Sequence, residues 1–379
     1  MNNHLDFYKK IDSIPTVNLN DLKKKILFDQ RDNFYFNIGL TKENFVGKKI
    51  LEFCPGTGYN AYYLIKKFKI KKIKLVDNNI ASIKFLKKNL SKLKNVNITM
   101  KDLNKFKSNE KYDFVIMENA IDNFSNEKKV LKKVSSYVKK DGFIILTIGD
   151  KYGILSMKLR FIYSLILLEQ KKIKDFNKKI SFLTSVFNSH LKYLSKNTRK
   201  TKKWVLDNII NSDFIRKKNY LDYPNLINML KENILIQNTS PQFNKNFIWY
   251  KNFKMDANNR LYLKNYFSER KNFLDFETSF EHDFNIERNL NSLYNYIYRL
   301  NPDKKLDIKV LQKIKSEVVT IIRKIKYKKK ISHNKVILAL EEFIKILENF
   351  NKKKIIKKNT RYFKKFWGIY NQNILLYKS

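Results

Sequence analysis

Residues 49–61, KILEFCPGTGYNA, constrain the fold of this 379-residue chain more than any other segment. An apolar strand-like run leads directly into a glycine turn and then a helix-like stretch, and a second strand-like run, KIKLVD, ends about 20 residues later at Asp77. Gly56 and Gly58 let the backbone turn tightly and approach a ligand closely, and a carboxylate at the next strand end can accept hydrogen bonds from ribose hydroxyls. The pattern predicts a site for an adenosine-containing cofactor.

The following hundred residues alternate short apolar runs with lysine-studded helical stretches, as a parallel sheet with crossover helices requires. Strands are predicted at KKILEFC, KIKLVD, NVNITM, YDFVIME and GFIILTI, and helices at NAYYLIKKF, ASIKFLKKNLSKL and NEKKVLKKVSSYVKK. Beyond residue 222, a helix LINMLKEN precedes a sixth strand, ILIQNTSP, and FIWYKNF is the candidate seventh. We therefore expect an α/β fold with a Rossmann-like, doubly wound, mostly parallel seven-stranded sheet.

The order of these landmarks resembles the class I S-adenosylmethionine-dependent methyltransferases. In that family the first strand ends in E/D-x-G-x-G-x-G; Glu52, Gly56 and Gly58 match three of the four places, and Cys54 stands at the first glycine. Four further landmarks follow in the family's order. Asp77 ends the second strand and Asp102 follows the third, YDFVIMENAIDNF contains the fourth strand, and Asp141-Gly142 makes the turn before the fifth.

This resemblance implies S-adenosylmethionine as the cofactor and assigns its contacts. Glu52 would anchor the glycine turn and the amino-acid end of the cofactor, Gly56 and Gly58 would let the methionine part pass close to the backbone, and Asp77 would hold the ribose. The other expected cofactor contacts are Asn78, Asp102 at the adenine amino group, Leu103 against the adenine ring, and Glu118 and Asn119 near the transferred methyl. A carboxylate at a strand end can instead simply cap the next helix.

Two other functions stay open. The same glycines together with Ala61 fit G-x-G-x-x-G/A, the fingerprint of NAD(P)-dependent oxidoreductases, although Glu52 in the first strand and the later Asp102 and Glu118 favour a methyltransferase. A catalytically degenerate fold used as a basic binding scaffold is the other alternative. The intact cofactor residues argue against it.

Residues 151–222 break the alternation and are predicted to form a helical insertion after the fifth strand. Insertions there lie over the open end of the site in this fold, so this segment is the candidate for substrate recognition. His190 is the candidate general base because a neutral imidazole works near pH 7, and a packed helix histidine is the alternative. The candidate residues for positioning the acceptor are Asp122, Trp204, Asp207 and Asn208. FNSHL, WVLDNIIN and the SPQF…WYK series also resemble a family of uncharacterised bacterial methyltransferases.

The predicted domain organisation has three parts. Residues 1–46 form a lead-in or lid over the cofactor, residues 47–251 form the S-adenosylmethionine-binding domain, and residues 252–379 form an all-helical C-terminal extension. The last part carries helical periodicity without a catalytic motif, which suggests a role in homo-oligomer formation or docking.

The formal net charge of +44 points at first to nucleic acid as a partner. Lysine greatly outnumbers arginine, however, and the chain has only 8 Gly and 5 Pro, so we attribute most of the charge to AT-rich codons. A small-molecule acceptor is therefore expected, with RNA- or protein-directed methylation as alternatives. One cysteine and four histidines without ligand spacing predict no metal site. The lack of an apolar run of about 20 residues predicts a cytoplasmic protein without a transmembrane segment.

Overall fold

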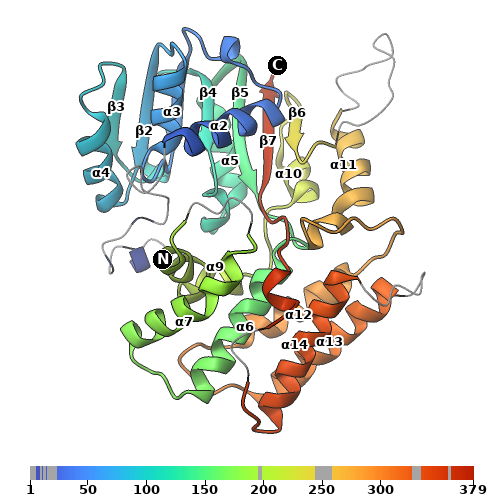
Figure 1. The fold of residues 1–379 in the computed structure, drawn as a ribbon. Helices are drawn as coiled ribbons and strands as arrows, with labels where there is room; N and C mark the ends of the chain where they lie inside the picture. The colour runs from blue at the N-terminus through green and yellow to red at the C-terminus, as the bar shows by residue number, and fades with distance from the viewer. Residues whose placement is uncertain are drawn as a thin grey trace. The chain divides into compact units, whose positions relative to one another are not determined.

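The computed structural model describes residues 6–8, 11, 14, 24–194, 199–243, 258–326, 334–356 and 360–379. The chain forms two compact units (Figure 1). Unit 1 comprises Met1–Gly149, Leu221–Phe267 and Asn371–Ser379, and unit 2 comprises Asp150–Tyr220 and Ser268–Tyr370. The chain therefore leaves unit 1 twice and returns to it twice, and the first excursion falls at the segment predicted as an insertion.

Unit 1 is built on one seven-stranded sheet with the order β3-β2-β1-β4-β5-β7-β6. Strands β1 to β5 are parallel, whereas β7 is antiparallel to both β5 and β6. The strands are β1 (Lys49–Phe53), β2 (Lys72–Asp77), β3 (Val96–Met100), β4 (Tyr112–Met117), β5 (Val138–Ile148), β6 (Ile234–Ser240) and β7 (Gln372–Lys378). The predicted α/β, Rossmann-like seven-stranded sheet is confirmed.

The seventh strand differs from the prediction. It is formed by residues 372–378, which the sequence analysis assigned to an all-helical extension, and FIWYKNF, residues 247–253, lies outside the described residues. The run ILLY is apolar on both faces of the strand, as a central strand covered on both sides requires. Figure 1 shows β7 between β5 and β6, two strands that are remote from it in the sequence.

The helices of unit 1 follow the predicted alternation and present their lysines outward. Asn79 caps α4 by accepting a hydrogen bond from the Ala81 N–H at 2.9 Å, and Asn126 caps α5 through the Lys129 N–H at 2.8 Å. The helices are α2 (Lys24–Asn37), α3 (Tyr59–Lys67), α4 (Ile80–Leu90), α5 (Glu127–Ser136), α10 (Tyr223–Met229) and α11 (Asn258–Glu269), whose last residues pass into unit 2.

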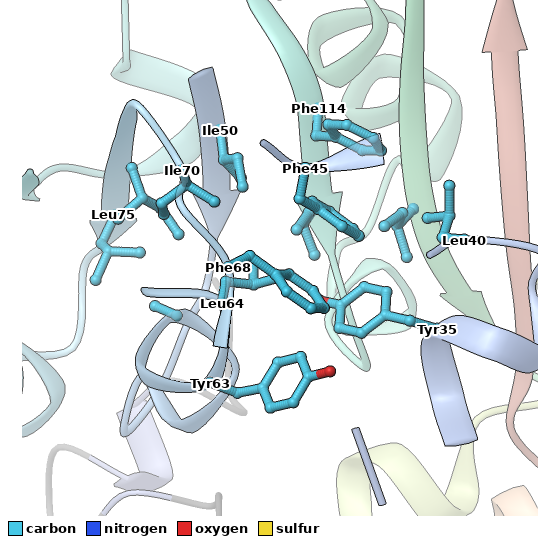
Figure 2. Close-up of a cluster of buried hydrophobic side chains, with 14 of the residues drawn as sticks. Tyr35, Leu40, Phe45, Ile50, Tyr63, Leu64, Phe68, Ile70, Leu75 and Phe114 are labelled. Atoms are coloured by element: carbon cyan, nitrogen blue, oxygen red, sulfur yellow. The ribbon is translucent and has the colours of Figure 1, made fainter. Parts of the chain in front are cut away.

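Aromatic side chains dominate one face of the sheet's core. Tyr35 of α2 stacks on Tyr63 of α3 with ring centroids 5.7 Å apart, and Phe45 stacks on Phe114 of β4 at 4.6 Å. Figure 2 shows these rings together, and Leu375 of β7 belongs to the same buried cluster. Helix α2, which lies before the first strand, is thus an integral part of unit 1.

Unit 2 consists of helices in the residues that the structure describes. The longer helices of unit 2 and the helices around the π-helix are α6 (Leu155–Gln170), α7 (Phe176–Leu191), α8 (Thr201–Val205), the π-helix η5 (Leu206–Ile210), α9 (Ser212–Arg216), α12 (Glu287–Arg299), α13 (Ile308–Lys326) and α14 (Lys335–Asn351). The last three come from the C-terminal segment that was predicted to be helical. Helix α6 is buried along nearly its whole length, including Lys158 and Arg160, whose charged groups donate to the carbonyls of Ile215 and Ser156. Among the described residues, no helix combines the length and apolarity needed to cross a membrane.

Candidate functional site

The turn after β1 places three residues in the left-handed region of the backbone. The φ angles are 55° at Cys54, 57° at Gly56 and 69° at Gly58. Cys54 therefore adopts the conformation that the family's first glycine would supply, at the cost of some strain. A Cβ on Gly58 would collide with the methyl groups of Leu86 and Leu90 of α4, so these side chains would have to shift.

Asp77 ends β2 and joins this turn to the start of α4. Its Oδ2 accepts a hydrogen bond from the Gly56 N–H at 3.2 Å, and its Oδ1 accepts one from the Asn79 N–H at 2.9 Å. Burial raises the pKa of Asp77 to about 6, against the lowering effect of these N–H groups. The carboxylate lies at the carboxyl end of the sheet, where a ribose would be held in an open α/β fold.

Glu52 is the most unusual group of the site. Only 4% of its surface is exposed; its Oε1 accepts a hydrogen bond from Asn60 Nδ2 at 3.3 Å, and its Oε2 has no partner among the described residues. Burial, followed by the charge of Glu118, raises the pKa of Glu52 to about 8. A buried acceptor without a donor is costly, so this oxygen fits a cationic donor such as the ammonium group of S-adenosylmethionine.

Arg31 is a residue of the site that sequence reasoning missed. From α2, its Nη1 and Nη2 donate to the Glu118 carboxylate at 2.9 Å, and Nη2 also donates to the Tyr59 hydroxyl. Its guanidinium lies over the ring of Tyr59, 4.3 Å from the centroid. Burial acts to lower the pKa of Arg31, but Glu118 raises it above its usual value. A single arginine among the aromatic residues of RDNFYF was the available signal.

The remaining predicted cofactor residues lie at the ends of β2, β3 and β4. Asn78 Nδ2 donates to Asp102 Oδ2 at 3.1 Å, while Asp102 Oδ1 accepts from the Asn104 N–H at 2.7 Å, and the following Leu103 is buried. Asn119 takes a left-handed φ of 52° directly after Glu118. The structure thus brings all predicted cofactor residues to one edge of the sheet in unit 1.

The predicted acceptor residues are divided between the units. Asp122 belongs to unit 1, where its Oδ1 accepts a hydrogen bond from the Leu221 N–H at 3.1 Å. The others belong to unit 2: Trp204 is buried against Phe187, Asp207 forms an ion pair with Arg199, and Asn208 Nδ2 donates to the Trp204 carbonyl at 3.0 Å. Asp207 and Asn208 lie in the π-helix η5, a distortion that is frequent at functional sites.

His190 lies in the interior of unit 2 and is 0% exposed. Its ring is surrounded by Tyr163, Phe187 and Phe363, with centroids 5.2 to 6.1 Å away, and neither ring nitrogen has a hydrogen-bond partner among the described residues. Burial, aided by the charges of Arg160 and Lys364, lowers the pKa of His190 well below its usual value. This environment favours the packing role over the predicted role of general base.

Replacing His190 with Phe should stabilise unit 2 by about 1–3 kcal/mol at pH 6, because an unpaired buried polar ring is exchanged for an apolar one. Because the pKa of His190 is lowered in the folded state, the stability that the neutral ring gives unit 2 is fully present above the unfolded pKa of about 6.5 and is lost as the pH falls. Urea unfolding at pH 5 and 7.5 should therefore show a smaller acid sensitivity in His190→Phe. A folded His190→Phe variant that gains no stability would contradict the packing role.

Comparisons with known proteins agree with the geometry of unit 1. Residues 44–204 match a family model described as a methyltransferase domain. Over 102 residues, the chain is 24% identical to an (S)-coclaurine N-methyltransferase from Thalictrum flavum subsp. glaucum, covering 26% of this chain and 28% of that protein. It is 26% identical over 102 residues to a malonyl-[acyl-carrier protein] O-methyltransferase 2 from Ilyobacter polytropus, covering 27% and 39%.

Solved structures that are similar to this chain include the N-methyltransferase NodS from Bradyrhizobium japonicum WM9 in complex with S-adenosyl-L-homocysteine. It is 10% identical, covers 39% of this chain and 74% of that chain, and superposes with a TM-score of 0.32. The chain spans well under half of the length of the two curated relatives. The match of residues 44–204 to a methyltransferase domain confirms the predicted resemblance to the methyltransferases for this part of the chain.

Proposed function

We propose that this chain, whose residues 44–204 carry a methyltransferase domain, transfers a methyl group from S-adenosylmethionine to a small-molecule acceptor. The observation that carries the proposal is the unpaired Oε2 of Glu52, buried beside the left-handed turn and on the same sheet edge as Asp77. One relative is named for the small molecule coclaurine, which supports a small-molecule acceptor, whereas the other is named for malonyl-[acyl-carrier protein], an acyl group carried on a protein.

The residues present suit the two ends of this cofactor. Glu52 would accept from the ammonium of the methionine part, and the turn at Gly56 and Gly58 leaves room for its chain close to the backbone. Asp77 would accept from the ribose hydroxyls, and Asp102 with Leu103 would hold the adenine. When bound, the cofactor supplies an electrophilic methyl on a sulfonium.

Methyl transfer is an in-line substitution in which the acceptor's lone pair forms the new bond to carbon and the carbon–sulfur bond breaks. The protein mainly has to align donor and acceptor and exclude water. The ion pair of Glu118 with Arg31 leaves that carboxylate fully engaged in hydrogen bonds, so we assign it to fixing the end of β4 rather than to removing a proton. A neutral amine or an already ionised acceptor needs no base before the methyl is transferred.

Acceptor recognition is assigned to residues 151–222, which contain Trp204, Asp207 and the π-helix. The chain passes into this segment directly after β5, the strand next to β4 in the sheet. Adding an acceptor in the presence of S-adenosylhomocysteine should slow amide hydrogen exchange in this segment. If the acceptor slows amide exchange only outside residues 151–222, this segment does not recognise the acceptor.

Replacing Asp77 with Ala should weaken S-adenosylhomocysteine binding by about 1–3 kcal/mol, because it removes the acceptor for the ribose hydroxyls and leaves them unpaired. Calorimetric titration of the purified protein measures this, and NAD is titrated in parallel. Asp141→Asn, which changes a carboxylate in β5 and keeps a residue that tolerates the left-handed φ of 58°, is the matched control. Unchanged affinity in folded Asp77→Ala, or tight NAD binding, would overturn the proposed function.

A further inference from the structure

Strand β7 is a central strand of unit 1 that the chain reaches only after crossing unit 2. Its residues pair with β5 on one side, with Ile148 opposite Gln372, and with β6 on the other, with Ile234 opposite Lys378. About a hundred residues of unit 2 separate it from α11, the preceding element of unit 1. Unit 1 therefore depends on a strand tethered to it through another folded body.

Unit 2 brings together the segments that leave β5 and that lead to β7. Gly153 and Gly368 cross backbone to backbone: a Cβ built on Gly153 would lie 2.1 Å from the Ile369 carbonyl oxygen, and one on Gly368 would lie 2.1 Å from the Gly153 carbonyl oxygen. The Gly368 N–H donates to Ser156 Oγ of α6 at 3.0 Å. Only glycine fits at either position of this crossing.

The segment that enters unit 2 after α11 is fixed to the same place. The Ile369 N–H donates to the Phe273 carbonyl at 2.8 Å, and the Phe276 N–H donates to the Trp367 carbonyl at 2.9 Å. The Trp367 N–H also donates to Asp275 Oδ2, a carboxylate that is almost completely buried, at 3.1 Å. Unit 2 thus closes its own long loop just before the chain enters β7.

We infer that the Gly153–Gly368 crossing is a clasp through which folded unit 2 holds β7 in register in the sheet of unit 1. With the crossing closed, β7 follows a short connection from a fixed point. With the crossing open and unit 2 unfolded, β7 is tethered by about a hundred residues, and the added loop-closure entropy lowers the population of the docked strand by roughly 30-fold. A shift of one residue would also turn the apolar side chains of β7 to the wrong face, so register has to be specified.

The clasp links the state of unit 2 to the core that supports the donor site. Leu375 of β7 belongs to the buried cluster that contains Tyr35 of α2, and Tyr35 donates to Asn60, which in turn donates to Glu52. Unfolding or opening of unit 2 would therefore weaken the packing of a central strand of unit 1 and not only of an edge strand. Assembly of the sheet in this way does not depend on which cofactor the protein binds.

The test lengthens the connection without touching either unit. In the full chain, 20 Gly/Ser residues are inserted between Tyr370 and Asn371, and amide exchange of Leu375 and Leu376 is measured without any ligand. We expect exchange to accelerate by roughly tenfold, since the connection after the clasp grows several-fold. The same insert between Lys304 and Lys305, both exposed in the turn before α13, is the control and should leave these amides unchanged.

A second variant, Gly368→Ala, opens the clasp itself and should accelerate the same amides, by up to roughly 30-fold when the hydrogen bonds of Trp367 and Ile369 in unit 2 are lost as well. Its control is Gly47→Asn, at a φ of 71° with no atom within 4 Å of a new Cβ. If Gly368→Ala does not fold, the insertion decides alone. Wild-type exchange at Leu375 and Leu376 in the insertion variant would overturn the inference, as would wild-type exchange in a Gly368→Ala protein whose Trp204 and Trp367 fluorescence shows that unit 2 has opened.

Discussion

Replacing Arg31 with Met is expected to destabilise unit 1 by about 3–5 kcal/mol, because it leaves the Glu118 carboxylate largely buried without its counter-charge. The side chains of Arg31 and Glu118 are 6% and 11% exposed, and three N–H···O contacts of 2.9 Å join them. Breaking such a pair costs far more than its net contribution, since the remaining charge has to be protonated or hydrated.

A double-mutant cycle separates the cost of breaking the Arg31–Glu118 ion pair from the net contribution of that pair to stability. Glu118→Gln removes the stranded charge, so Arg31→Met combined with Glu118→Gln should recover much of the lost stability measured by urea unfolding. Lys67→Met is the matched control, because its ion pair with Asp32 is 44% and 42% exposed and is worth under about 1 kcal/mol. Equal losses in the single and double variants would show that Arg31 stabilises unit 1 by packing on Tyr59 alone.

The sheet of unit 1 was largely predictable because its signals are local. Each strand from β1 to β6 is a short apolar run beside a helix with lysine on its outer face, and the turn at Gly56 and Gly58 marks where they converge. The pattern could not identify β7, since pairing of residues 372–378 with β5 is set by contacts more than 200 residues apart. A continuous apolar run reads equally well as a buried strand or a helix segment.

The site was predictable only as far as it lies at strand ends. Glu52, Asp77 and Asp102 follow from their positions in or just after the last residues of strands, whose ends the chain's connectivity brings to one edge. Arg31 could not be found this way, because its role depends on how α2 packs against α3 and β4. For His190 the sequence left a general base and a packed histidine open, and its burial among aromatic rings, which favours packing, is a tertiary property that the sequence does not display.

Replacing Glu52 with Gln is expected to stabilise unit 1 at pH 8 by a few kcal/mol and to remove part of its pH dependence. The folded pKa of about 8 lies above the unfolded value of about 4.3, so the protonated Glu52 contributes stability that is complete below pH 4 and is lost as the pH rises toward 8. Asp77, with a pKa of about 6, acts in the same direction over a narrower range. Urea unfolding between pH 5 and 8 should therefore show a flatter profile in Glu52→Gln than in the wild type.

The raised pKa of Glu52 also predicts that protons are released when the ligand binds. At pH 7 the free protein holds Glu52 mostly protonated, and a cationic ammonium placed against Oε2 would lower its pKa, so S-adenosylhomocysteine binding should release close to one proton. Calorimetry in buffers of different ionisation enthalpy measures this number directly. Glu52→Gln should release none and bind about 1.5–3 kcal/mol more weakly, because a charge-assisted hydrogen bond is lost. Glu232→Gln, an exposed change in the same unit, should behave as wild type, and proton release that persists in Glu52→Gln would place the ammonium elsewhere.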